Sequence, residues 1–246
     1  MQLLVGRPVS LTVLDFGLFH VHAGRVIGIP GFLIVTDRGE HVLVDTGFAP
    51  AYAVDAPAAG RRDGLDAFGV LVGYGAAQTV QGQLALRGLV PGDIDLVVLT
   101  HSHIDHVGGL GAFAGHRVVL SVAERALPRP LYWGAVQRMA WPDADYISID
   151  GDTDIGPGLR LLHVPGHVPG QLALWLSLPE TGDVLLTSDA ISRPTELAEG
   201  FVGADDPVLA GQSAARLMAL SQGAFTIWGH CPEQWAGLRK GMEYYL

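Results

Sequence analysis

The most informative ten residues of the chain read Thr100-His101-Ser102-His103-Ile104-Asp105-His106-Val107-Gly108-Gly109. Three histidines and one aspartate, all side chains that bind metal ions, fall within six residues. The apolar run 94–99 before them predicts a buried strand, and the two glycines after them let a helix start close by. Two imidazoles two residues apart can bind one cation from an irregular loop, and the carboxylate and imidazole that follow can bind a second. A polar loop that holds these histidines by chance is disfavoured, because His-x-His-x-Asp-His is far rarer than isolated histidine.

Composition and charge narrow the class of protein. Of the 246 residues 49% are hydrophobic and 16% are charged, which is typical of a folded chain with a packed core. The formal net charge of −10, with only 15 Lys and Arg residues, leads us to expect no nucleic-acid partner. No apolar run approaches the ~20 residues of a membrane span. Residues 1–8 do not resemble a secretory signal, so we expect a cytoplasmic location.

The remaining metal ligands must be His, Asp or Glu, because a single cysteine, Cys231, excludes a thiolate-rich site and an internal disulfide. Three positions repeat the arrangement of the first loop, in which an apolar strand ends at a residue able to bind a metal. These positions are His167, Asp189 and His230. Each alone is better explained as a structural residue, whereas together with the first loop they predict one site.

Hydrophobic patterning predicts a strand-rich chain with interspersed helices. The expected strands cover 9–15, 26–35, 41–44, 94–99, 117–120, 145–149, 159–164, 171–178, 183–187 and 225–228. The expected helices cover 79–89, 121–127, 205–220 and 233–244. Residues 55–78, rich in Gly and Ala, are expected to form an irregular excursion or a mobile loop on the substrate side. No linker separates the two halves, so a single domain over residues 1–246 fits best.

For several features the sequence alone leaves two explanations open. Asp45, at the end of a strand, either orients a ligand histidine or is a plain turn aspartate. The aromatic segment 131–142 is either a wall over the active site or a packed helix face, and packing is favoured because aromatic side chains mostly bury themselves. His20 and His22 line a pocket mouth or, the favoured explanation, lie at a strand end or on the surface. Cys231 is interpreted as a packing residue rather than a nucleophile.

In this order the metal-binding residues resemble the metallo-β-lactamase superfamily, whose pattern is His-x-His-x-Asp-His, then His, then Asp, then His. The resemblance covers nearly the whole chain, and it implies an αββα sandwich of the α+β class, with two packed mixed sheets, outer helices and the site at one edge of the sheets. It also implies that one cation takes His101, His103 and His167, that the other takes Asp105, His106 and His230, and that Asp189 bridges them. Five imidazoles and two carboxylates suit two Zn²⁺ ions, although Fe, Mn or Co can occupy the same ligands.

Two such cations ~3.5–4 Å apart can hold a bridging hydroxide at neutral pH and polarise a carbonyl or phosphoryl oxygen. We expect this hydroxide to attack an ester-like carbonyl without a protein nucleophile. The expected catalytic carboxylates are Asp189, which bridges the cations, and Asp105, which can carry a proton to the leaving group.

Within the superfamily the chain looks most like the quorum-quenching N-acyl homoserine lactone lactonases, in its length, in Asp45-Thr46-Gly47 and in Gly229-His230-Cys231-Pro232-Glu233-Gln234. Those lactonases commonly carry a Tyr that contacts the lactone three residues after the bridging aspartate, where this chain has Ser192. The resemblance therefore implies hydrolysis of an N-acyl homoserine lactone or a related lactone, with an esterase or phosphotriesterase as the alternative. A catalytically silent metal-binding or partner-docking module is the alternative outside enzymes, and the complete ligand set argues against it. A homodimer that uses exposed aromatic residues such as Tyr132-Trp133 is a further expectation.

Overall fold

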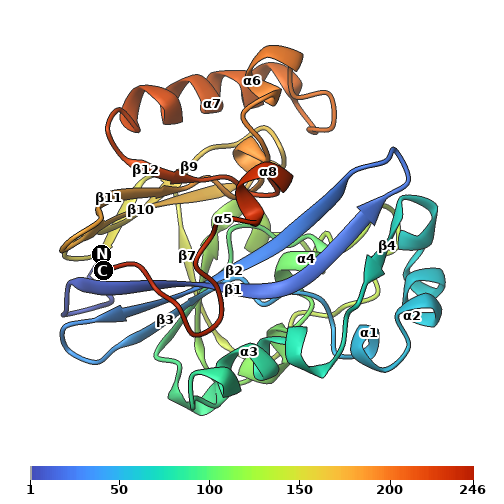
Figure 1. The fold of residues 1–246 in the computed structure, drawn as a ribbon, viewed down its shortest axis with the longest axis horizontal. Coiled ribbons are helices and arrows are strands. Elements are labelled where there is room, and N and C mark those ends of the chain that lie inside the picture. The colour runs from blue at the N-terminus through green and yellow to red at the C-terminus, as the bar shows by residue number, and fades with distance from the viewer. Residues whose placement is uncertain (1) are drawn as a thin grey trace.

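Two mixed β-sheets pack face to face, and helices cover their outer faces (Figure 1). The computed structural model describes residues 2–246. The first sheet has the order β4-β1-β2-β3-β5-β6-β7. Its strands are β1 Pro8–Val21, β2 Val26–Thr36, β3 His41–Val44, β4 Gly69–Val72, β5 Leu96–Val98, β6 Arg117–Ser121 and β7 Asp145–Ile149. The second sheet has the order β12-β11-β10-β9-β8. Its strands are β8 Thr153–Gly156, β9 Leu159–His163, β10 Leu172–Leu178, β11 Gly182–Leu186 and β12 Phe225–Ile227.

The helices are short apart from α7, which lies with α6 over the second sheet, whereas α1 to α4 lie on the other side of the molecule (Figure 1). Their bounds are α1 Ala51–Val54, α2 Ala56–Asp63, α3 Val80–Leu86, α4 Ile104–Val107, α5 Val122–Arg125, α6 Glu196–Glu199, α7 Pro207–Leu220 and α8 Pro232–Trp235. Within residues 2–246, no helix is both long and apolar enough to cross a membrane. The expected αββα sandwich is confirmed.

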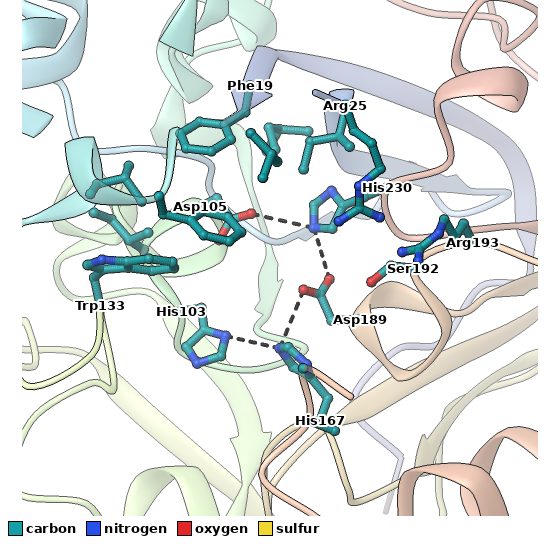
Figure 2. Close-up of a pocket in the computed structure, with 18 of the residues that line it drawn as sticks. Phe19, Arg25, His103, Asp105, Trp133, His167, Asp189, Ser192, Arg193 and His230 are labelled. Carbon is teal, nitrogen blue, oxygen red and sulfur yellow. Dashed lines mark hydrogen bonds and ion pairs between the residues drawn. The ribbon is translucent and has the colours of Figure 1, made fainter. Parts of the chain in front are cut away.

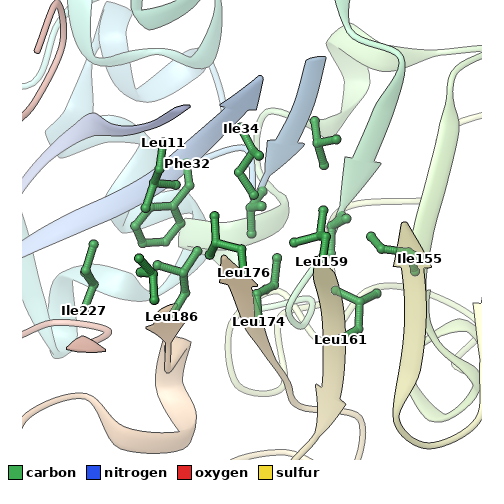
Figure 3. Packing of buried hydrophobic residues seen from close by; sticks show 14 of the residues in the cluster. Leu11, Phe32, Ile34, Ile155, Leu159, Leu161, Leu174, Leu176, Leu186 and Ile227 are labelled. Carbon is green, nitrogen blue, oxygen red and sulfur yellow. The ribbon is translucent and has the colours of Figure 1, made fainter. Parts of the chain in front are cut away.

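The core between the sheets follows from the two-residue period of the strands. Alternate residues of β10, including Leu174 and Leu176, point toward the first sheet and meet Leu11 and Phe32 (Figure 3). The residues between them face the opposite way, so that Ala173 packs in the cluster under α7. Burying each such leucine contributes about 1.5–3 kcal/mol, so the two sheets hold each other in place.

The structure corrects three expectations from the sequence. Residues 55–78 are not simply irregular: they contain α2 and β4, and β4 pairs antiparallel with β1. The aromatic segment 131–142 forms no helix. The expected helix over 233–244 is only the four residues of α8, because the chain then returns to the first sheet, where Leu11 and Tyr245 exchange two backbone hydrogen bonds. In all three places a segment far along the chain supplies hydrogen bonds that local patterning cannot anticipate: β1 for β4 and for the C-terminal residues, and residues 102–104 for Tyr132.

The strand ends that carry the expected ligands meet at one edge of the sandwich. β5 leads into the loop of His101, β9 leads toward His167, β11 leads to Asp189, and β12 leads to His230. β3, β5 and β6 run parallel, as do β11 and β12, so their carboxyl ends point the same way within each sheet. Ligands in α/β folds bind at this kind of edge.

Candidate metal centre and its pocket

The structure brings all seven expected ligands together: six of them form two groups of three, and Asp189 joins these through a third group with His101 and His106. Figure 2 shows His103, Asp105, His167, Asp189 and His230 of this set. The ligand atoms of each group lie within 4.8 Å of one another. Asp189 lies between the groups: its Oδ1 is 3.1 Å from His230 Nε2 and its Oδ2 is 3.5 Å from His167 Nε2. The first group is His101, His103 and His167, and the second is Asp105, His106 and His230.

Asp45 orients one of these histidines, which decides between the two explanations that the sequence left open. It follows β3 with a φ of 61° and is almost fully buried. Its Oδ2 accepts a hydrogen bond from His106 Nδ1 at 2.8 Å, which leaves His106 Nε2 pointing into the site. Its two oxygens also accept hydrogen bonds from the backbone and hydroxyl of Thr100, both at 2.8 Å. Asp45 therefore ties the end of β3 to residues 100–106, which we call the metal-binding loop.

Two further residues hold the ligands, and sequence patterning did not single them out. Ser188, with a φ of 46°, donates from Oγ to Thr100 Oγ1 at 2.9 Å and so fixes the residue next to Asp189. Glu124 of α5 is buried and accepts a hydrogen bond from Ser102 N at 2.9 Å, directly between His101 and His103. Its only sequence signal is an acidic side chain on a helix that must pack against the sheet.

Burial and neighbouring charges shift the pKa values of the imidazoles in opposite directions. Burial, helped by neighbouring imidazoles, lowers the pKa of His103 to about 4 and holds the pKa of His101 well below its ordinary value. Burial acts the same way on His230, but the carboxylates of Asp189 and Asp105 outweigh it and raise the pKa of His230 to about 9. The carboxylates therefore create a strongly negative potential that favours positive charge, and the neutral imidazoles offer lone pairs beside it.

The donor set fits divalent cations on its own chemistry. His106 Nε2 and Asp189 Oδ1 are buried and have no hydrogen-bond partner among residues 2–246. Unpartnered buried polar atoms are costly unless something else binds them. Imidazole nitrogens and carboxylate oxygens that converge in this way are the ligands that zinc and related metals prefer.

A family comparison agrees with this geometry. Residues 26–230 match the model of the Metallo-beta-lactamase superfamily. The chain belongs to the metallo-β-lactamase superfamily. The matched range includes all seven of the expected ligand residues.

Relatives within the superfamily carry a more specific name. The chain is 32% identical to the N-acyl homoserine lactonase AiiA of Bacillus thuringiensis subsp. kurstaki over 230 residues, which cover 90% of this chain and 89% of the relative. It is 29% identical to the N-acyl homoserine lactonase AttM of Rhizobium radiobacter, with 89% and 88% covered. A crystal structure of an N-acyl homoserine lactone hydrolase with N-hexanoyl-L-homoserine bound at its metal centre superposes with a TM-score of 0.83 at 26% identity, covering 98% of this chain and all of the other.

A cavity of about 320 Å³ opens beside the ligands (Figure 2). His103, Asp105 and Asp189 lie at its floor, and Ser192 and Arg193 lie on its polar side. Its opposite wall is apolar and comes from β1, β2, α4 and the segments after β3, α2 and α5. The apolar residues are Phe19, Val21, Ile27, Ile29, Phe48, Leu65, Phe68, Ile104 and Trp133.

The cavity settles the other open alternatives. Trp133 lines it, whereas Tyr132 beside it is only 3% exposed and packs in the core, so the aromatic segment serves partly as wall and partly as packing. His22 Nε2 donates a hydrogen bond to Asp66 O at 2.7 Å and does not line the cavity, as the surface explanation predicted. Cys231 is buried beside Glu233, which agrees with packing. Because Tyr132 is buried, it cannot be the exposed dimer surface that we expected.

Proposed function

We propose that this chain is a dinuclear-metal hydrolase that opens the ring of an N-acyl homoserine lactone or a related lactone. The observation that carries the proposal is a complete set of seven convergent ligands directly beside a largely apolar cavity. The N-acyl homoserine lactonases that the chain resembles over nine-tenths of its length support the same substrate class. An amphiphilic lactone matches this cavity, because one end is polar and the other is apolar.

The proposed ligands follow the two groups. His101, His103 and His167 would hold one cation, Asp105, His106 and His230 would hold the second, and Asp189 would contact both. Zinc is the proposed metal because the ligands are imidazoles and carboxylates, and Fe, Mn or Co would accept the same set. When bound, such a pair supplies Lewis acidity toward a carbonyl and an activated water at neutral pH.

Side chains of the protein carry the other roles in the proposed reaction. Asp105 borders the cavity with a side chain that is 17% exposed, and its carboxylate would take a proton from the attacking water and pass it to the departing oxygen of the opened lactone. Asp189 keeps its orientation through Ser188 and Thr100. The apolar wall would bind the acyl chain and exclude water from the reacting ester. Ser192 occupies the polar side, where a shorter side chain than Tyr leaves more room for the ring.

Proton release tests this proposal directly. We expect zinc-loaded protein to release one proton for each N-decanoyl homoserine lactone opened, and His103→Ala to abolish the release. His41→Ala, at the far end of β3 from the site, is the matched control and keeps wild-type activity. Release by His103→Ala at the wild-type rate, or none by the wild type, would overturn the assignment. Activity on aryl esters or phosphotriesters alone would favour the alternative hydrolase.

A further inference from the structure

A buried polar cluster lies behind the apolar wall of the cavity. Asp63, the last residue of α2, has a fully buried side chain whose carboxylate accepts hydrogen bonds from Tyr132 at 2.9 Å, from Tyr52 at 3.1 Å and from Arg62 at 2.7 and 2.8 Å. We call these four residues the Asp63 cluster. Burial alone would raise the pKa of Asp63, but hydrogen bonds and the charge of Arg62 outweigh it and hold the pKa below its ordinary value. The carboxylate is therefore ionised and fully partnered at neutral pH.

Tyr132 connects the Asp63 cluster to the metal-binding loop. Its backbone N–H donates to Ser102 O at 2.8 Å, and its carbonyl accepts from Ile104 N at 2.9 Å. These two bonds lie on either side of His103. Tyr132 has a φ of 57°, a left-handed conformation that costs about 1–3 kcal/mol in a non-glycine residue unless its surroundings hold it. The two backbone bonds to the metal-binding loop supply part of that restraint, and the hydrogen bond from its hydroxyl to Asp63 supplies the rest.

The same cluster joins two aromatic residues that line the cavity. The chain that continues from Asp63 leads to Phe68, and the chain that continues from Tyr132 leads to Trp133. Trp133 Nε1 donates to Gly64 O at 3.2 Å, and the rings of Phe68 and Trp133 have centroids 5.2 Å apart. Both rings line the cavity. Their separation therefore depends on how firmly the two segments are held behind them.

We propose that Asp63 is a positioning residue that sets the acyl-chain selectivity of the cavity. Through the Tyr132 hydroxyl it fixes the spacing between the segment of Phe68 and the segment of Trp133, and a long acyl chain contacts both. The proposal requires that a short acyl chain end before it reaches both rings, so that its binding does not depend on their spacing. The inference rests on the proposed lactonase function for its substrates, but it concerns residues that touch neither metal nor ester.

Tyr132→Phe and Tyr52→Phe form a matched pair of variants. Each removes one hydroxyl from the same carboxylate, and both tyrosines are almost fully buried. Only Tyr132 is bonded to the metal-binding loop and adjoins Trp133. Both variants should lower Tm to a similar extent, so a general loss of packing affects them equally.

Steady-state kinetics with N-decanoyl and N-butanoyl homoserine lactone separate the roles. We expect Tyr132→Phe to raise KM for the decanoyl lactone about tenfold and for the butanoyl lactone less than twofold, with kcat and metal content unchanged. Tyr52→Phe should leave both KM values within twofold of wild type. Equal KM changes for the two lactones, or equal effects of the two variants, would overturn the proposal.

Calorimetric binding of N-decanoyl-L-homoserine, the ring-opened product, is measured alongside. If the wild type opens neither lactone, the proposed function fails, and the binding data still decide the inference. A Kd about tenfold weaker in Tyr132→Phe alone supports the role of Asp63, and equal Kd values in the two variants refute it.

Discussion

Asp45→Ala is expected to weaken both the fold and the metal centre. The substitution removes an acceptor that serves Thr100 N, Thr100 Oγ1 and His106 Nδ1, all at 2.8 Å in a site that is 2% exposed. The hydroxyl can rotate to another partner, but the backbone N–H and the imidazole cannot. Each unpartnered buried donor costs about 1–3 kcal/mol, so we expect the free energy of unfolding to fall by about 2–6 kcal/mol.

The variant Asp45→Asn separates the effect of Asp45 on the orientation of His106 from its effect on stability. Asparagine tolerates the φ of 61° and keeps one oxygen for Thr100 N, so the stability loss should be smaller. Its amide cannot offer His106 the same charged acceptor, and losing such a partner typically costs 10–100-fold in metal affinity. Chelator competition measures the zinc affinity, and urea unfolding measures stability.

Asp95→Asn is the control for this pair, because Asp95 also accepts a backbone hydrogen bond, from His41 N at 2.8 Å, at the other end of β3. It should leave zinc affinity unchanged. If Asp45→Asn binds zinc within twofold of wild type, then the hydrogen bond to Asp45 does not orient His106 and the reasoning is refuted.

Three further predictions concern removal of the metal, the packing around Gly28 and the pH dependence of stability. Removing metal with a chelator should lower Tm and restoring zinc should recover it, because a ligand at 100 times its Kd adds about 2.7 kcal/mol of stability; an unchanged Tm would contradict a metal-dependent fold. Gly28→Val should destabilise the protein by about 1–3 kcal/mol, because a Cβ there would lie 2.0 Å from the Trp235 ring. Gly92→Ala, where a Cβ meets nothing within 4 Å, is its control in denaturant unfolding. Burial would raise the pKa of Glu40, but hydrogen bonds from two backbone N–H groups and from Thr36 hold this pKa below 4.5. The ionised Glu40 therefore stabilises the folded protein above pH ~4.5, and this stabilisation is lost as the pH falls through the pKa of the folded state. Glu40→Gln should therefore lose stability at pH 7 and little at pH 3, and equal losses at both values would show that the charge does not matter.

Much of the site could be predicted because its ligands are tied to local patterns. His101, His103, Asp105 and His106 share one loop, so their proximity needs no knowledge of the fold. His167, Asp189 and His230 follow apolar strands, and strand ends gather at one edge of a sheet. The αββα sandwich was predicted through the family resemblance, which the same residues carry.

The parts that could not be predicted depend on partners far along the chain. Asp63 and Tyr132 are 69 residues apart and neither belongs to a motif, yet they share a hydrogen bond behind the cavity. Glu124 reads as an ordinary helix residue until the metal-binding loop packs over it. β4 was missed because its apolar run is short, and it is a strand only because β1 extends to Val21 and pairs with it.

The sequence by itself determined which side chains are available to bind metal: the residue types, their order and their places at strand ends permit a dinuclear site of imidazoles and carboxylates. Only the tertiary structure decided what surrounds that site. It turned Asp45 toward His106, brought Phe68 and Trp133 together over the cavity, and buried the Asp63 carboxylate among its donors. The physical reason is that ligand identity is a property of single side chains, whereas the orientation of a ligand and the shape of a cavity are properties of contacts between segments that only packing brings together.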